Sequence, residues 1–305
     1  MGAWRRKTHK HYTISAEKKK VTSIACCAII NMKNEGGGIL LKLGLSTAAF
    51  YGRYETEDAA AHMASLPIDC AEVFLQSDSE NRVEFAGLVR ERLGNLSCTS
   101  VHPLGGYENY MAGRPARQIR DAFDHFRRVL DAGQTLGAKT FVYHGRNTPL
   151  LSALPWNLEW NVEAIAPMCE EADKRGMVIG WENVSWCQLT TPQRVLEAKT
   201  ALPQVCFTLD IKQAMRAGCD PLTFVHAMGD RLCNVHVCDW DEEGRLCLPG
   251  EGVFDFGALI NLLHAQGYDG PVIMEPYLAL IRSDEALLRS IAYMKDVIEG
   301  VKNNE

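Results

Sequence analysis

The chain has 305 residues, of which 47% are hydrophobic, and its formal net charge is −6. A chain of this length can bury one large core, so a single catalytic domain is expected. Residues 1–20 hold seven Lys and Arg against one Glu, so the rest of the chain carries −12, which disfavours binding to nucleic acid phosphates.

The first 38 residues have the composition of a leader rather than of a folded segment. A basic run and the repeat Gly36–Gly38 surround an apolar stretch at 21–30, which is too short to cross a bilayer. We therefore expect residues 1–38 to be a disordered or non-native leader and residues 39–305 to form the domain. No apolar stretch elsewhere is long enough to span a membrane, so no membrane partner is expected.

The cysteines indicate a reducing environment. There are eleven, including the adjacent pair Cys26 and Cys27, and no two have CxxC spacing. Others, such as Cys206 and Cys233, lie within apolar runs. An odd number of cysteines scattered through core-like segments favours reduced thiols, and with them a cytoplasmic location, over a disulfide framework.

From residue 39 onward, short apolar runs alternate with longer segments of helical periodicity. This alternation is typical of a parallel sheet with crossover helices. The eight apolar runs cover residues 39–47, 70–76, 96–102, 140–145, 178–183, 205–210, 232–239 and 271–276. Eight strands permit closure, so we predict a single (β/α)8 TIM barrel, although periodicity alone leaves a doubly wound sheet open.

The helices between these runs are recognised by their apolar stripes. The clearest is predicted over 115–135, where Ile119, Phe123 and Phe126 recur at three- and four-residue spacing. Similar stripes cover 161–174, 254–266 and 284–299. Gly137 and Gly267 are placed where two of these helices should end.

Polar side chains end six consecutive strands, at the edge where a parallel barrel places its catalytic groups. They are His102, His144, Glu182, Asp210, His236 with Asp239, and Glu275. A single acidic residue at a strand end is usually only solvated, so the prediction of a site depends on finding such residues at the ends of six consecutive strands. Three carboxylates and an imidazole from four successive strands suit one divalent ion: Mn²⁺, Co²⁺, Mg²⁺ or Zn²⁺.

Five segments resemble the xylose-isomerase-like superfamily of TIM barrels. They are GWENV (180–184), TLDIKQA (208–214), NVHVCD (234–239), LPGEGVFDF (248–256) and VIMEPY (272–277). That superfamily includes ketose 3-epimerases, hydroxypyruvate isomerases, inosose dehydratases and three-zinc AP endonucleases. By position, the resemblance implies that Glu182, Asp210, His236 and Glu275 bind the metal, with Glu182 and Glu275 also acting as the catalytic acid and base.

The sequence departs from the family pattern at two places. The family often has Asp-x-x-His after the sixth strand, whereas here Asp210 is followed by Gln213, an amide that suits a substrate oxygen better than a metal. An Asp-x-His pair of the nucleases is replaced by Gly244, Arg245 and Leu246. Two of the additional zinc ligands are therefore missing.

Several further residues are candidates for substrate binding. With those zinc ligands missing, His102 and His144 are expected to face the substrate or to support the ligands, and a buried, satisfied histidine is the alternative for each. Trp186, just beyond Glu182, is the preferred aromatic candidate, and Arg245 could hold a hydroxyl or phosphate, although loop arginines are usually exposed. The Gly-rich turn at 249–252 either approaches the site or simply leads into the next helix.

These features predict a metal-dependent isomerase or epimerase of a small carbohydrate. Removing a proton beside a carbonyl gives an enediolate, which a bound metal stabilises and which the glutamates can reprotonate. Return of the proton to the enediolate gives epimerisation or isomerisation, whereas loss of a β-hydroxyl gives dehydration. The alternative prediction is therefore a lyase of the inosose-dehydratase type. An AP-endonuclease-like phosphodiesterase and a non-catalytic sugar-binding barrel are less favoured, and a homo-oligomer stays open.

Overall fold

The computed structural model describes residues 41–147 and 155–302. The predicted leader, residues 1–38, lies outside the described residues, as do Cys26 and Cys27. Everything that positions the candidate site belongs to the described part.

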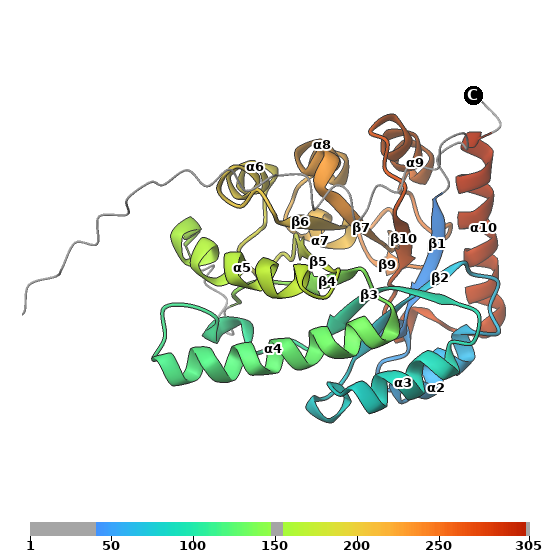
Figure 1. Cartoon of the computed structure of the whole chain (residues 1–305). Coiled ribbons are helices and arrows are strands. Elements are labelled where there is room, and N and C mark those ends of the chain that lie inside the picture. Colours follow the sequence, from blue (N-terminus) through green and yellow to red (C-terminus); the bar gives the residue numbers. More distant parts are fainter. Residues whose placement is uncertain (1–40, 148–154, 303–305) are drawn as a thin grey trace, which may run out of the picture.

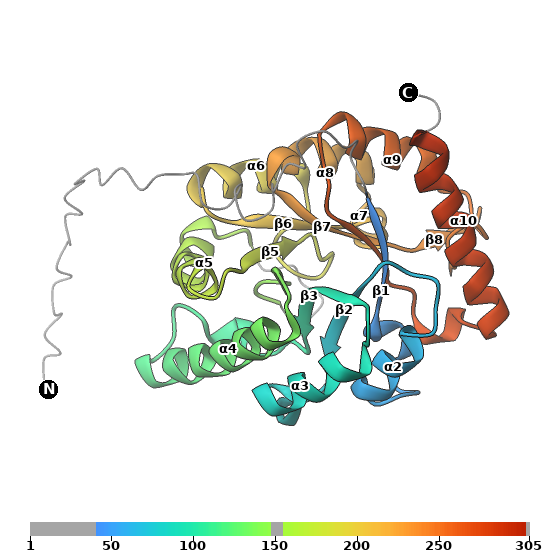
Figure 2. The same ribbon diagram turned by 45° about the vertical axis from the view of Figure 1, so that its right-hand side comes forward.

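Eight parallel strands close into a barrel in the order β1-β10-β7-β6-β5-β4-β3-β2, which Figures 1 and 2 show from two sides. The strands are β1 (Lys42–Ser46), β2 (Cys70–Leu75), β3 (Ser97–Pro103), β4 (Thr140–Tyr143), β5 (Val178–Glu182), β6 (Cys206–Asp210), β7 (Leu232–Val237) and β10 (Pro271–Met274). Each lies within one predicted apolar run, except that β3 extends one residue beyond its run, to Pro103. The predicted (β/α)8 barrel is confirmed, and closure of the sheet excludes the doubly wound alternative.

Helices follow the strands, and all but the short, largely buried α7 form the outer layer of the barrel (Figure 2). They are α2 (Thr56–Met63), α3 (Val83–Arg92), α4 (Ala116–Leu136), α5 (Leu158–Asp173), α6 (Pro192–Ala201), α7 (Ile211–Arg216), α8 (Pro221–Met228), α9 (Phe256–Ala265) and α10 (Asp284–Lys302). The apolar stripe of α4 packs inward, with Phe126, Val129 and Leu130 buried. Gly137 ends α4 in the left-handed conformation (φ 86°), as predicted from the sequence.

The seventh predicted run is divided in the structure. Its first part is β7, and its end belongs to a short antiparallel hairpin of β8 (Asp239–Trp240) and β9 (Leu246–Cys247). The sequence pattern did not reveal this hairpin because two-residue strands are too short to show an alternation of apolar and polar residues.

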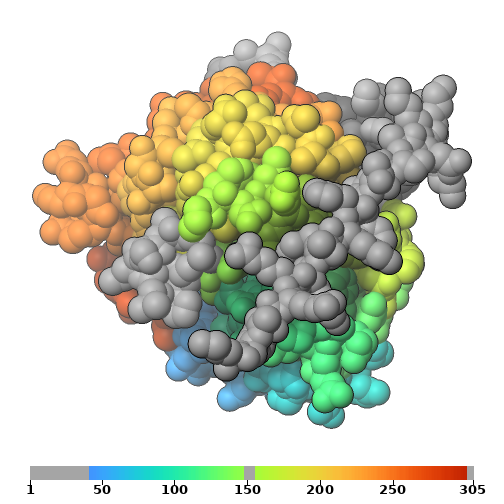
Figure 3. All heavy atoms as spheres, turned by 90° about the vertical axis from the view of Figure 1, so that its left-hand side faces the viewer, coloured from blue at the N-terminus to red at the C-terminus, as the bar shows by residue number. Residues whose placement is uncertain are grey.

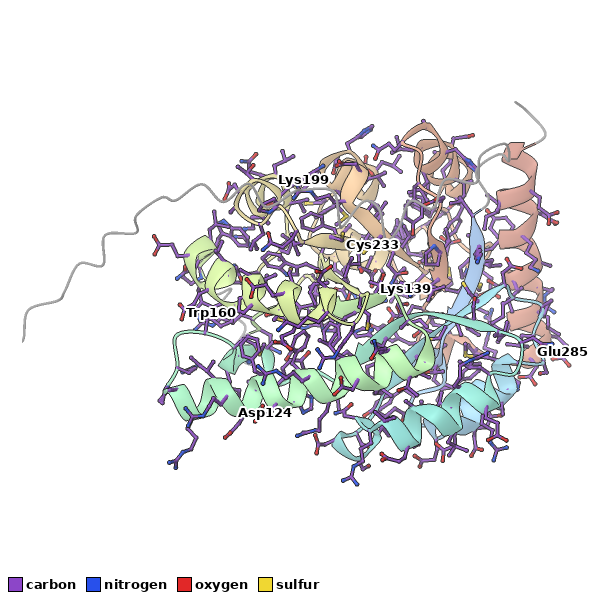
Figure 4. The ribbon with its side chains drawn as sticks, viewed as in Figure 1. Asp124, Lys139, Trp160, Lys199, Cys233 and Glu285 are labelled. Atoms are coloured by element: carbon purple, nitrogen blue, oxygen red, sulfur yellow. The ribbon has the colours of Figure 1, made fainter. Side chains whose placement is uncertain are left out.

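Side chains fill the interior of the barrel below the strand ends. Val178, Cys206 and Cys233 form a small buried cluster, and a Cβ added at Gly180 would lie 2.6 Å from Thr208 Oγ1. Figure 4 shows Cys233 among the interior side chains, whereas Glu285 lies outside on α10. The barrel is thus a packed core, and its carboxyl-terminal mouth is where chemistry can take place.

No helix among residues 41–147 and 155–302 combines the length and the apolar character needed to cross a bilayer.

The thiols of the interior should be chemically inert. None of the nine cysteines in the described residues forms a disulfide, and burial raises the pKa of Cys70, Cys98 and Cys238 to about 12. Thiolate is the reactive form, so in the folded protein at pH 8 we expect these three to escape alkylation by iodoacetamide. Mass spectrometry of labelled peptides checks this, with protein in guanidinium as the fully labelled control. Rapid native labelling of all three would contradict the packing described here.

Candidate active site at the mouth of the barrel

The strand ends bring four of the predicted residues to one place. Glu182 and Asp210 are the last residues of β5 and β6, His236 lies in β7, and Glu275 directly follows β10. Asp210 pairs with His236 across the β6–β7 register, and His236 pairs with Ile273 of β10. Residues nearly one hundred positions apart therefore meet because neighbouring parallel strands end at the same edge.

Glu182, Asp210, His236 and Glu275 form a compact, buried cluster of potential metal ligands. One side-chain donor atom from each lies within 4.8 Å of the others. Nδ1 of His236 is 3.4 Å from Glu182 Oε1 and 3.5 Å from Glu275 Oε2, and it has no hydrogen-bond partner. Three carboxylates and a buried ring nitrogen without a hydrogen-bond partner are a donor set suited to a divalent cation.

Glu72 in β2 belongs to the same site, although the strand-end pattern did not identify it. Its Oε2 accepts hydrogen bonds from Ser100 Oγ (2.7 Å) and Asn234 Nδ2 (3.0 Å) and lies 2.9 Å from His236 Nε2. Burial alone would raise its pKa, but the neighbouring His236 and His102 hold the pKa well below the usual value. The only sequence signal was a glutamate in the apolar run CAEVFL.

The contact between Glu72 and His236 orients the ring. In a neutral His236, a proton on Nε2 pointing at Glu72 leaves Nδ1 as the acceptor that faces Glu182 and Glu275. Without a cation, the surrounding carboxylates raise the pKa of His236 well above its usual value, against the effect of burial. Glu72 thus favours the tautomer that offers Nδ1 to the cluster, and Asn234 Nδ2 also lies 2.9 Å from the same Nε2.

Lys212, in the first turn of α7, is the second residue that sequence reasoning missed. Its buried Nζ lies 2.6 Å from Asp210 Oδ2 and 2.5 Å from Glu275 Oε2. Burial would lower the pKa of Lys212, but the charges of Asp210, Glu275 and Glu182 raise it well above the usual value. A cationic side chain is therefore part of the acidic cluster.

The two carboxylates that share Lys212 differ in their surroundings. Burial raises the pKa of Glu275, but Lys212 and His236 outweigh it and hold the pKa at about 2. Burial also raises the pKa of Asp210, to about 6, because the attraction of Lys212 is offset by the negative charges of Glu182 and Glu275. Glu275 is consequently the more strongly stabilised anion.

Asp210 is fixed by contacts on both sides. Its Oδ1 caps α7 by accepting a hydrogen bond from the backbone N–H of Gln213 (3.0 Å), and the side chain of Asn183 bonds both its backbone N–H and its carbonyl. The side-chain oxygen of Gln213 accepts a hydrogen bond from Ser185 Oγ (2.7 Å). The amide of Gln213 thus links α7 to the loop after β5.

His102 and His144 extend the cluster along β3 and β4. Their Nε2 atoms lie 2.8 Å apart, and His144 Nε2 is 3.0 Å from Glu182 Oε2. Nδ1 of His102 is 3.6 Å from Glu275 Oε1 and has no hydrogen-bond partner, so this ring is not a satisfied core histidine. Glu275 and Glu72 raise the pKa of His102 to about 10 although burial opposes the shift. Both histidines thus touch the carboxylates predicted for catalysis.

Two exposed aromatic side chains border the cluster. Trp186, 48% exposed, has its ring 6.4 Å from the ring of His144. Tyr277, 43% exposed, has its ring 5.7 Å from Lys212 Nζ. Of this pair, the sequence singled out Trp186.

Arg245 does not join the cluster. It lies in the β8–β9 hairpin, with a side chain that is 71% exposed and paired with Asp241 and Glu243. The orange segment that contains this hairpin projects from the body in Figure 3. The structure therefore gives this arginine the solvated role that loop arginines usually have.

Asp239 organises the Gly-rich loop after the seventh barrel strand. Its buried carboxylate accepts backbone hydrogen bonds from Gly250 (3.1 Å), Gly252 (3.0 Å) and Phe254 (3.1 Å). A Cβ at Gly252 would lie 2.2 Å from the carbonyl oxygen of Trp240. The same Cβ would lie 2.4 Å from Asp239 Oδ1, so Gly252 permits a close approach to Asp239, whereas a Cβ at Gly250 would meet the ring of Tyr293 at 2.7 Å.

We expect Asp239→Asn to lower the free energy of unfolding by about 2 kcal/mol, because an amide offers one accepting oxygen and turns an N–H₂ group toward N–H donors. Urea unfolding followed by circular dichroism measures the change. Asp241→Asn, on the exposed hairpin, is the matched control and should cost less. Equal stabilities for the two variants would show that the carboxylate of Asp239 does not hold the loop.

Comparison with known proteins identifies the family. Residues 60–297 match the family described as xylose isomerase-like TIM barrel. The chain belongs to this family. The resemblance inferred from the five sequence segments is thereby confirmed.

Curated relatives of this family member include dehydratases at low identity. A 3-dehydroshikimate dehydratase of Pseudomonas putida is 28% identical over 154 residues, 44% of this chain and 24% of that protein. An inosose dehydratase of Lacticaseibacillus casei is 24% identical over 203 residues, 55% of this chain and 66% of that protein. The matched regions thus span about a quarter and slightly under two thirds of these relatives.

Solved structures share the fold over almost their whole length. A D-tagatose 3-epimerase-like protein superposes with a TM-score of 0.70 at 22% identity, covering 87% of this chain and 99% of that one. A D-psicose 3-epimerase in the presence of D-fructose gives 0.71 at 16%, covering 85% and 99%. The IOLI protein with a bound zinc atom gives 0.65 at 16%, covering 86% and 99%. Relatives and neighbours named as epimerases and dehydratases support an enzyme.

Proposed function

We propose that this protein is a divalent-metal-dependent isomerase or epimerase of a ketose or a related hydroxy-keto compound. The convergence of Glu182, Asp210, His236 and Glu275 in one buried cluster carries the proposal. Structural neighbours that are named ketose 3-epimerases, and that match along nearly their whole length, support the reaction class.

The residues fit a divalent ion. Nδ1 of His236 is buried without a hydrogen-bond partner, and the three carboxylates face one another at close range. Glu182, Asp210, His236 and Glu275 would hold the ion, for which Mn²⁺, Co²⁺, Mg²⁺ and Zn²⁺ suit the ligand types. When bound, the ion supplies positive charge that polarises a substrate carbonyl.

Glu182 and Glu275 are proposed to move the proton. Glu182 ends β5 and Glu275 follows β10, and these strands are separated in the barrel by β6 and β7, so the two glutamates approach the centre from different sides. One carboxylate removes the proton beside the carbonyl, and the other returns it on the opposite face. His144, 3.0 Å from Glu182, and His102, 3.6 Å from Glu275, are placed to share those protons.

The substrate is proposed to be a small carbohydrate held between aromatic side chains. The exposed rings of Trp186 and Tyr277 lie beside His144 and Lys212, where the apolar face of a sugar can pack. A reducing compartment such as the cytoplasm suits a chain whose nine described cysteines form no disulfide. The acidic charge gives no support to a nucleic acid partner.

A dehydratase is the second candidate, favoured by the names of two curated relatives. It would share the first proton abstraction and then expel a β-hydroxyl group. A new ultraviolet absorbance from an enone product distinguishes it from the epimerase.

We expect the Mn²⁺-loaded protein, incubated with a panel of ketoses in D₂O, to introduce deuterium at a carbon beside the carbonyl. Exchange should stop when the ion is removed with EDTA and resume when Mn²⁺ is restored. Proton NMR and mass spectrometry of the recovered sugars measure the exchange. Absence of deuterium in every sugar of the panel would count against the isomerase and epimerase proposal.

Glu182→Gln and Glu275→Gln should each reduce the exchange rate by about a hundredfold or more, because an amide cannot act as a general base. Glu285→Gln, on the outer face of α10, is the matched control and should retain the wild-type rate (Figure 4). Circular dichroism establishes that the variants are folded. A folded Glu275→Gln protein with undiminished exchange would remove Glu275 from the proposed mechanism.

A further inference from the structure

Lys212 occupies a position that a simple site of three carboxylates and a histidine does not require. Its Nζ bridges Asp210 Oδ2 at 2.6 Å and Glu275 Oε2 at 2.5 Å. We propose that Lys212 is an internal counter-cation that competes with the divalent ion for Asp210 and Glu275 and so weakens the binding of that ion. When the ion is absent, Lys212 neutralises part of the negative charge and stabilises the acidic cluster.

The position of Lys212 is determined by the chain and does not depend on a flexible surface contact. The residue is 3% exposed, and it lies in the turn that Asp210 caps through the backbone N–H of Gln213. A buried ammonium is stable only when it is paired and hydrogen-bonded. Asp210 and Glu275 supply that pairing, and the positive charge of Lys212 in turn reduces the repulsion between their two carboxylates.

Competition follows from the shared oxygens. A divalent ion binds carboxylate oxygens at about 2.0–2.2 Å. If the ion bound the two oxygens that Lys212 Nζ contacts, the ion and the ammonium would lie within a few ångströms of each other. In a buried site the repulsion between two such positive charges is strong. The ion must therefore either displace the ammonium or bind despite that repulsion. Both reduce the affinity of the site for the ion.

Tyr277 provides a second place for the ammonium. Its ring lies 5.7 Å from Lys212 Nζ, on the exposed side of the cluster, and its hydroxyl accepts a hydrogen bond from Arg216 Nη1 at 2.8 Å. The face of a tyrosine ring attracts a cation. The guanidinium carbon of Arg216 lies 5.4 Å from the same ring, so a lysine released from Asp210 and Glu275 would share this ring with a second cation, and their repulsion adds to the cost of displacing the ammonium.

The test measures binding of Mn²⁺ alone, by electron paramagnetic resonance of the free ion and by calorimetry, to wild type, Lys212→Met and Lys174→Met. Lys174 pairs with Glu171 on the surface and is the matched control. We expect the Kd of Lys212→Met to be at least about tenfold lower than that of wild type, because the competing charge is gone. The control should bind like wild type.

Thermal unfolding provides a second readout. The ion-free Lys212→Met protein should melt several degrees below wild type, because its carboxylates lose their counter-charge, and Mn²⁺ should raise its Tm more than it raises that of wild type. If this variant folds only when Mn²⁺ is present, that result also supports the proposal. If it does not fold at all, Lys212→Gln replaces it with the same expected increase in affinity.

The proposal is overturned if the folded Lys212→Met variant binds Mn²⁺ as tightly as wild type or more weakly. It is also overturned if neither wild type nor this variant binds Mn²⁺. The inference rests on the cation site of the proposed function but not on its reaction. Deuterium exchange with the ketose panel tests the reaction separately. Tighter binding by the variant together with no exchange in wild type would reject the reaction and leave the role of Lys212 standing.

Discussion

The structure of the site depends on keeping several carboxylates together in a buried space. Two unit charges 4 Å apart repel by about 4 kcal/mol at an effective dielectric constant of ~20, and the cluster holds Glu182, Asp210 and Glu275, with Glu72 behind them. The compensating groups are Lys212 and the neighbouring histidines. This balance explains why the pKa of Glu275 falls to about 2 while that of Asp210 rises to about 6.

The barrel supplies the rigidity that such a cluster needs. Glu182 and Asp210 end strands that are hydrogen-bonded on both sides, Glu275 directly follows such a strand, and Asp210 is additionally fixed by the capped turn of α7 and by Asn183. Asp239 orders the neighbouring loop through backbone N–H groups and leaves the centre to the other acidic residues. The packed interior below excludes water from one side, so charges at the mouth interact strongly with one another.

The family and the geometry agree on an enzyme but not on one product. Epimerases, isomerases and dehydratases can all begin by removing a proton beside a carbonyl, and the proposed bases Glu182 and Glu275 would serve any of them. The outcome then depends on where the proton returns and on how the hydroxyl groups are held, which the groups around Trp186 and Tyr277 would control. At these low identities the structural neighbours establish the fold, whereas the reaction rests on the site.

The sequence by itself determined the eight strands, four of the helices and the four strand-end residues Glu182, Asp210, His236 and Glu275. It could do so because apolar periodicity and the ends of apolar runs are local signals, and a parallel barrel brings all those ends to one edge. Only the tertiary structure showed that Glu72 and Lys212 belong to the cluster and that Arg245 does not. Their roles depend on contacts across strands and on side-chain direction; Glu72 meets His236 from 164 residues away. No local pattern records such a contact.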